Sequence, residues 1–344
     1  MATSNIGSEA GTGSVQVEPR DDRTGALARA GQWLVRTQEG VLLLTLIALC
    51  VILANRSPVF LSERNLGLLL SQVAMTAIAA VGMTLLIIAR EIDLSVGSLQ
   101  ALVGVTAMQA LNATDNLALG IAAAVAIGAV VGLVNAGLTL GLGINSFIVT
   151  LAMFSALRGL AYTFTDAAVQ NEHKLPSFRA VGIGFLGPVP WPVVVMAVVF
   201  GLFLLILNRT TFGRYVYAVG GNPRAALLAG VPVNAVKTAC FVITGVLAAL
   251  SAFLLIARMN SGQNNAGFGF ELQVIGAALL GGASLLGGAG TLLGTLLAVL
   301  LLGTLNNGIV LLGINSSWQT AVNGFVILIA VFLDARRRRA VGEA

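Results

Sequence analysis

Ionisable side chains that interrupt long apolar runs are the first candidates for chemistry in this sequence. Glu91 and Asp93 stand between two such runs, and Arg158 lies towards the end of another. A charge at membrane depth is costly, and such groups commonly serve an ion pathway, a substrate pathway or a gate. Arg158 has no carboxylate near it in the sequence, so it is poorly suited to relay protons. The pattern therefore favours a gate over a proton pathway.

Asp93 and several lone amides each admit two interpretations. The Asp93 carboxylate can cap the helix expected to follow it, with Ser95 and Gly97 allowing close packing, or it can take part in gating. Lone amides can line a hydrated path for a hydroxyl-rich solute or can join helices by hydrogen bonds. The candidates for translocation and gating are Asp93, Ser95, Gly97, Asn145, Arg158, Asn306 and Asn307.

The rarity of histidine, cysteine and lysine excludes several kinds of chemistry. His173 is the single histidine, and Cys50 and Cys240 are too few for a cysteine-based zinc cluster. A phosphate-binding loop needs Gly-Lys-Ser or Gly-Lys-Thr, and neither Lys174 nor Lys237 follows a glycine. A nucleic-acid surface needs bases clustered with polar and aromatic residues on an exposed face, and the bases here are explained instead by the sidedness of membrane spans. We therefore expect no catalytic residue, no metal, no cofactor, no nucleic-acid partner and no enzymatic activity.

The elements that must position these residues are membrane helices. Of the 344 residues, 57% are apolar and 10% are charged, against about 25% charged in soluble domains. A helix needs about 20 apolar residues to cross a bilayer. The runs without Asp, Glu, Lys or Arg are Gly40–Asn55, Asn65–Ala89, Leu94–Thr114, Asn116–Leu157, Ala180–Asn208, Thr238–Ala257 and Leu272–Leu333.

Two of these runs are long enough for more than one span. The run from Asn116, extended to about Thr165, predicts two spans with a break at Gly141–Asn145. The last run predicts three, with breaks near Gly287–Gly290 and Gly313–Ser317. Glycines four residues apart, such as Gly128 and Gly132, predict close helix packing. The expected fold is an all-α, polytopic integral membrane protein with about ten transmembrane helices.

The distribution of basic residues predicts how these helices are oriented. Ten spans place both termini on one side, and that side then holds 13 of the 19 Lys and Arg residues, with five on the other. Because bases favour the cytoplasmic side, both termini are expected to be cytoplasmic. The predicted organisation is a disordered cytoplasmic N-terminal tail (1–39), a transmembrane domain (40–335) and a basic cytoplasmic C-terminal tail (336–344).

One long cytoplasmic connection, the coupling segment (208–237), contains a short predicted helix. Asn222 can cap it, Pro223 suits its first position, and Gly230 ends it after one to two turns. A simple connector is the plain interpretation, but a connector needs only a few residues. Ala225, Ala226 and Gly230 are small, so we expect this helix end to seat in a cleft of a partner protein.

Three motifs together carry a specific resemblance to a known family. The first two are Glu91–Ser98 (EIDLSVGS) and Asn145–Gly159 (NSFIVTLAMFSALRG). The third is in the coupling segment and has two parts, Thr210–Arg214 (TTFGR) and Ala218–Val231 (AVGGNPRAALLAGV). Over roughly residues 40 to 335 the chain resembles the membrane permeases of ATP-binding-cassette sugar importers, in the ribose, xylose and galactose branch. Arg224 and Ser146 depart from the pattern, since the family has an acid and a proline there.

The resemblance implies a permease subunit of the inner membrane that performs no chemistry on its substrate. A binding protein in the periplasm or outside the cell would deliver a monosaccharide, and two cassette ATPases that bind ATP would drive transport. The translocation path would lie between two permease subunits, as a homodimer or a pseudo-symmetric pair. The residues expected to couple to the ATPases are Gly221, Asn222, Pro223, Arg224, Ala225, Ala226 and Gly230.

The sequence is compatible with three other functions. A secondary carrier driven by an ion gradient would need ionisable groups at membrane depth, which are scarce here. A membrane-embedded enzyme would need a clustered acid, histidine or metal site. A permease of the same family for a branched-chain amino acid or another small solute has the same composition as a sugar permease.

Overall fold

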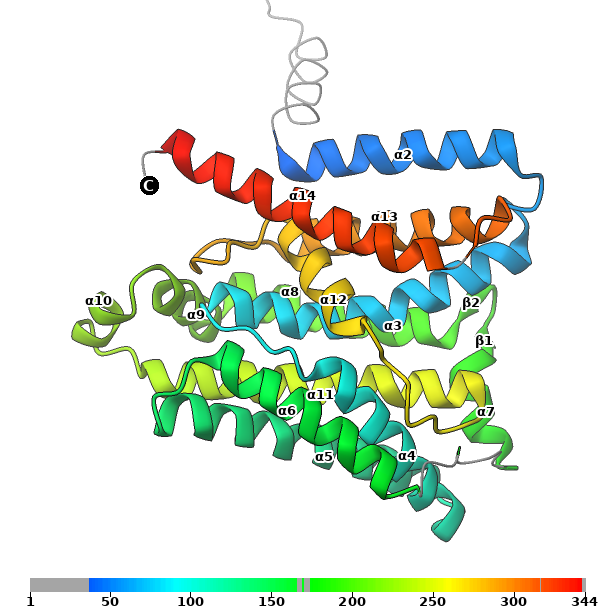
Figure 1. Ribbon diagram of the computed structural model, residues 1–344, viewed down its shortest axis with the longest axis horizontal. Helices are drawn as coiled ribbons and strands as arrows, with labels where there is room; N and C mark the ends of the chain where they lie inside the picture. The colour runs from blue at the N-terminus through cyan, green and yellow to red at the C-terminus, as the bar shows by residue number, and fades with distance from the viewer. Residues whose placement is uncertain (1–36, 166–168, 170–173, 316, 342–344) are drawn as a thin grey trace, which may run out of the picture.

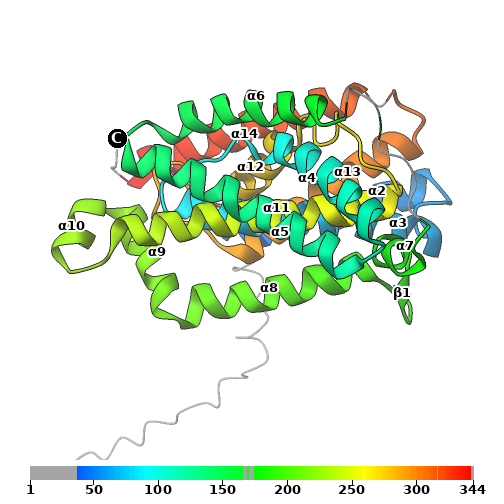
Figure 2. The ribbon, with the colours of Figure 1, turned by 90° about the horizontal axis from the view of Figure 1, so that it is seen from below.

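The computed structural model describes residues 37–165, 169, 174–315 and 317–341, and these form a bundle of helices (Figures 1 and 2). Most of the predicted N-terminal tail, and His173, lie outside the described residues. The helices are α2 (Gln38–Arg56), α3 (Glu63–Ile88), α4 (Val96–Thr114), α5 (Leu117–Ala136), the π-helix η1 (Gly137–Gly141), α6 (Ser146–Thr163), α7 (Pro176–Ile183), α8 (Trp191–Arg209), α9 (Thr211–Gly221), α10 (Pro223–Leu228), α11 (Val233–Met259), α12 (Phe270–Leu280), α13 (Leu292–Leu311) and α14 (Ser317–Val341). In the described residues the strands are β1 (Phe185–Leu186) and β2 (Val189–Pro190), an antiparallel hairpin in which Phe185 pairs with Pro190.

Seven of the described helices are long and apolar enough to cross a membrane, which confirms a polytopic, helical membrane protein. They are α2, α3, α5 with η1, α6, α8, α11 and α13. The eighth predicted span is much shorter than expected, because α12 has 11 residues. At 1.5 Å per residue it covers roughly half of the ~30 Å hydrocarbon layer. The chain therefore contains a half-length helix inside its bundle.

Helix α3 is the central element and α2 the most peripheral of the seven. In an apolar stretch of 18 residues of α3, 94% of the residues are buried within the protein, and α11, α13, α12 and α8 pack around this helix. In the same length of α2 only 17% of the residues are buried, and α2 packs mainly on α13. Protein side chains therefore surround α3, whereas most of α2 faces outward.

Glycines bring α5 and α11 into backbone contact. A β-carbon on Gly128 would overlap the backbone of Gly245, and one on Gly132 would lie 2.6 Å from the carbonyl oxygen of Phe241. The absence of side chains at these positions is what permits the close approach. The predicted packing role of Gly128 and Gly132 is confirmed.

Two non-helical segments interrupt the bundle, at 89–95 between α3 and α4 and at 281–291 between α12 and α13. Their first turns have the same hydrogen bonds, since Glu91 N–H donates to Leu86 O and Ala283 N–H to Ala278 O, both at 3.0 Å. Arg90 (φ +67°) and Gly282 (φ +100°) occupy the corresponding left-handed position. The helix expected from Leu94 therefore begins only at Val96, and the second break is longer than predicted.

The two ends of the bundle differ. α9 and α10 lie at one end, and α7 with the β1–β2 hairpin lies at the other (Figures 1 and 2). In Figure 1, α14 ends towards the α10 end, and α2 runs away from that end from a start near the middle of the bundle. α14 continues through the arginines at 336–339 to Val341, so the predicted C-terminal tail is helical as far as that residue.

Candidate functional site

Asp93 is the centre of a buried polar cluster in the 89–95 segment. Its side chain is fully buried, and its Oδ1 accepts hydrogen bonds from the backbone N–H of Ser95 at 2.7 Å and from the Ser95 hydroxyl at 2.6 Å. Its Oδ2 accepts one from the Asn135 amide of α5 at 3.0 Å. A buried carboxylate is tolerated when its oxygens are satisfied in this way. The cluster ties the non-helical segment to α5.

The geometry corrects the predicted capping role of Asp93. The N-cap residue of α4 is Ser95, and its side chain makes no capping hydrogen bond. Asp93 instead holds the turn that precedes the helix, through its bonds to Ser95. The carboxylate therefore fixes the shape of the broken segment rather than the first turn of α4.

Two opposite charges, separate from the Asp93 cluster, lie where α4, α6 and α12 come together. Glu271, in the first turn of α12, is 9% exposed, and its Oε2 lies against Gly97 of α4. Nη1 of Arg158 donates to the carbonyl oxygens of Asn264 at 3.0 Å and Ala266 at 2.6 Å. The Arg158 and Glu271 charges are near enough to interact electrostatically.

Sequence reasoning missed Glu271. It stands at the edge of the long uncharged run that begins at Leu272, where it resembles an ordinary boundary residue. The fold brings this carboxylate within electrostatic range of Arg158, 113 positions away in the sequence, without a salt bridge between them. The available signal was an acid directly before a membrane run, followed by no other charge until position 334.

None of the three candidate amides is hydrogen-bonded to Asp93, whose partners are Ser95 and Asn135. Asn145 caps α6 by accepting from Phe147 N–H at 2.9 Å. Asn307 of α13 and Asn65 of α3 exchange two hydrogen bonds, at 3.1 and 2.8 Å. The backbone carbonyl of Asn306 accepts from Gln319 of α14 at 3.2 Å. The Asn65–Asn307 pair therefore supports the helix-joining interpretation for Asn307, whereas the buried side-chain oxygen of Asn306 has no hydrogen-bond partner among the described residues.

The predicted short helix of the coupling segment is present as α10. The Asn222 side chain accepts a hydrogen bond from Ala225 N–H at 3.0 Å, and Pro223 occupies the first helical position. Gly230 has φ +81°, and nothing lies within 4 Å of the place where a β-carbon would be. A glycine is needed there for the left-handed turn and not for close packing.

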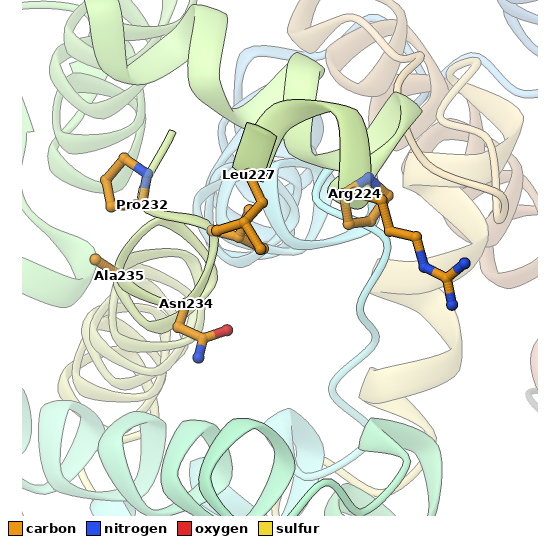
Figure 3. Close-up of a pocket in the computed structure, with 7 residues that line it drawn as sticks. Arg224, Leu227, Pro232, Asn234 and Ala235 are labelled. Atoms are coloured by element: carbon orange, nitrogen blue, oxygen red, sulfur yellow. The ribbon is translucent and has the colours of Figure 1, made fainter. Parts of the chain in front are cut away.

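The exposed face of α10 differs from the one expected. Ala226 is 5% exposed and packs within its own chain, so the expectation that it seats in a partner is wrong. Leu227 and Leu228 are 63% and 90% exposed instead. Figure 3 shows Leu227 beside an apolar cavity of about 410 Å³ between α10 and the start of α11, while the Arg224 guanidinium extends away from it.

These features define a multi-pass membrane protein with broken helices inside its bundle and an exposed short helix at one end. The family described as branched-chain amino acid transport system / permease component matches residues 65–331. The chain belongs to that family. It is a transport subunit of the membrane, and ATP hydrolysis in such systems falls to a separate subunit.

Relatives cover nearly the whole chain. The ribose import permease protein RbsC of Escherichia coli (strain K12) is 41% identical over 309 residues, which are 89% of this chain and 95% of that protein. The L-arabinose ABC transporter permease protein AraH of Azospirillum brasilense is 39% identical over 315 residues, 91% of this chain and 92% of the relative. RbsC of Bacillus subtilis (strain 168) is 40% identical over 296 residues, which are 86% of this chain and 92% of that protein. No solved structure matches the chain. The resemblance to sugar-importer permeases is confirmed.

Proposed function

We propose that this chain forms the translocation path of an ATP-binding-cassette importer for a monosaccharide. The observation that carries the proposal is the 41% identity to a ribose import permease over 95% of that protein's length. The relatives named for L-arabinose support the same class of substrate, a small polyhydroxylated sugar. The family description names branched-chain amino acids, which makes a permease for those solutes the second candidate.

The ATPases would dock at α10. A leucine that is 90% exposed, in a short helix outside the membrane-spanning helices, is suited to bury its side chain in a groove of a protein partner. Leu227 and Arg224 flank it on the exposed surface and add an apolar and a cationic contact. The docking surface is therefore Arg224, Leu227 and Leu228, with Ala226 supporting it from behind.

Three further features complete the proposed assembly. The chain has ten membrane segments, of which α4, α12 and α14 accompany the seven long apolar helices, and its termini are cytoplasmic. The common end of α10 and the α14 terminus supports this orientation (Figure 1). A second copy of the permease provides the other half of the path, and an extracytoplasmic binding protein delivers the sugar. Asp93 and its partners in the broken segment form part of the gate.

Uptake by proteoliposomes tests the function directly. The chain is reconstituted with its cassette ATPases, and ATP-dependent uptake of labelled ribose, L-arabinose and leucine is compared, with the matching binding protein supplied for each. We expect uptake of a pentose and none of leucine. Leucine uptake without pentose uptake would contradict the sugar assignment in favour of the second candidate.

Docking has its own test. We expect Leu228→Asp to abolish co-purification of the ATPases without lowering the thermal stability of the permease. Leu186 of β1, which is 54% exposed at the opposite end of the bundle, provides the matched control Leu186→Asp. Equal recovery of ATPases with both variants would show that α10 is not the docking surface.

A further inference from the structure

A nearly buried ion pair joins the coupling segment to the broken segment that holds Asp93. Nζ of Lys237 lies 2.5 Å from Oε1 of Glu91, and their side chains are 12% and 10% exposed. Within the part of the chain that the structure describes, this is the only salt bridge. Removing one partner of such a pair would leave an uncompensated, poorly hydrated charge, so the two groups resist separation.

The two residues belong to different working parts of the molecule. Lys237 lies in the first turns of α11, five residues after Pro232 ends the loop that follows α10. Glu91 lies two residues before Asp93 in the 89–95 segment. The pair lines a cavity of about 370 Å³ that also reaches Pro223 of α10 and Asn145 at the start of α6. The ion pair is therefore the direct polar link between the rear of the coupling segment and the gate candidates.

Helix α9, which precedes α10 in the coupling segment and is called its front, is held by backbone contacts close to the 89–95 segment. The carbonyl oxygen of Ile88, the last residue of α3, accepts a hydrogen bond from Gly288 N–H at 2.9 Å. Gly220 of α9 lies against that carbonyl with no space for a β-carbon, and a β-carbon on Gly288 would be 2.7 Å from Cα of Gly221. The end of α9 is thus wedged between the end of α3 and the 281–291 segment.

A tyrosine strengthens this front attachment. The Tyr217 hydroxyl of α9 donates to the carbonyl oxygen of Gly290 at 2.8 Å. Burial raises the pKa of Tyr217 above its usual value, so the phenol stays protonated and remains a donor at neutral pH. Helix α10 therefore sits between two anchors, the glycine contact before it and the ion pair after it.

We propose that the Lys237–Glu91 ion pair is a positioning element that transmits movement of α10 to the 89–95 segment. This inference rests on the proposed docking of ATPases at α10. A displacement of α10 relative to its front anchor tilts the start of α11. Lys237 then pulls Glu91, and with it the turn that Asp93 holds.

Charge reversal tests this transmission. We expect Lys237→Glu and Glu91→Lys each to lower the amount of sugar imported per ATP hydrolysed about tenfold, within the range typical of coupling between sites. The ATPases should still co-purify and hydrolyse ATP, because the docking surface is unchanged. The double variant K237E/E91K restores the pair with reversed polarity, and we expect it to recover the wild-type ratio to within roughly twofold.

Neutral variants guard against simple misfolding. Lys237→Met and Glu91→Gln keep similar volumes and avoid two like charges, and membrane abundance and thermal unfolding are measured for every variant. Each neutral variant, and the two combined, should fold and remain poorly coupled. The matched control is Arg56→Glu, an exposed base at the end of α2 and outside the coupling segment, which should keep the wild-type ratio.

The outcomes separate the inference from the proposed function. A reversed or neutral pair with wild-type coupling, a double reversal no better than either single variant, or an equal loss in the Arg56 control would each overturn the transmission role. Loss of the ATPases from the pair variants alone would assign the pair to docking and would also overturn it. Failure of the wild-type chain to retain ATPases would contradict the proposed function itself.

Discussion

The carboxylate of Glu271, at the start of α12, lies directly on the backbone of Gly97 in the first turn of α4. The contact brings the half-length helix against the helix that follows the Asp93 turn. A side chain at position 97 would displace the carboxylate towards Arg158 or force the two helices apart. Gly97 is thus a contact residue between two of the interrupted elements, which gives its predicted packing role a specific partner.

Gly97→Ala should therefore impair the protein. We expect overpacking to cost about 1–3 kcal/mol of stability and to lower uptake at equal membrane abundance. Thermal unfolding of the purified protein and uptake in cells measure the two effects. Gly159→Ala on α6 is the control, since nothing lies within 4 Å of a β-carbon there. Equal behaviour of the two variants would show that the Glu271 contact has no energetic consequence.

Asp93→Asn should lower uptake while leaving the chain in the membrane. The change removes the charge and brings an amide donor towards the Asn135 amide, which already donates to Asp93. Hydrogen bonds to charged groups contribute about 1.5–3 kcal/mol, so we expect uptake to fall about tenfold or more. The double variant D93N/N135D offers an acceptor to the new amide and should recover part of the activity. Full uptake by Asp93→Asn would assign Asp93 a purely structural part in the turn.

Ala226 and Ala225 separate support of α10 from docking. Ala226→Glu places a charge in a buried position and should lower stability by about 2 kcal/mol or more. Ala225→Glu adds a charge at an exposed position next to Arg224 of the docking surface, and should leave thermal unfolding unchanged while weakening recovery of the ATPases. Unfolding curves and co-purification are measured for both. Identical unfolding curves would contradict the burial of Ala226.

Gly230 tests the turn that ends the α10 region. Its φ of +81° disfavours residues with a β-carbon, so Gly230→Ala should cost about 1–2 kcal/mol. Gly230→Asn should cost less, because asparagine adopts left-handed conformations more readily. Thermal unfolding of the two variants ranks them. An alanine variant as stable as the wild type would mean that this turn adjusts freely.

Reporter fusions test the proposed orientation. A reporter active only in the cytoplasm should work when fused near Thr211 or after Arg339, and should fail near Lys174. Ten spans with cytoplasmic termini require this pattern, and the positive-inside distribution predicts it. Cytoplasmic activity at Lys174 would contradict the ten-span topology.

Sequence reasoning succeeded where a few neighbouring residues decide the structure. Asn222, Pro223 and Gly230 supply a cap, a first-turn residue and a left-handed terminator within nine positions, and α10 forms between them. Uncharged runs likewise predict helices because lipid leaves backbone groups no other partners. The break at 142–145 follows from glycines and a capping asparagine next to each other.

Sequence reasoning failed where contacts between segments far apart in the chain determine which residues are buried or paired. The exposure of Ala226 depends on how α10 lies on the bundle, and a helix of six residues is too short for a periodic pattern that could reveal it. The charges of Glu271 and Lys237 find their neighbours only after α12 and α11 have packed. The half-length of α12 is hidden too, because a 62-residue run without charges contains no mark of where its helices stop.

The different surroundings of α2 and α3 have a consequence for how the bilayer affects this protein. Neighbouring helices enclose α3, so its tilt is fixed by the fold, whereas most residues of α2 face away from the bundle. A mismatch between hydrophobic length and membrane thickness costs a fraction of a kcal/mol per Å and is relieved by tilting. Thinner or thicker membranes should therefore reorient α2 on α13 before they disturb the centre. A change in the tilt of α2 would therefore adapt the protein to lipids of different lengths while the packing around α3 stays the same.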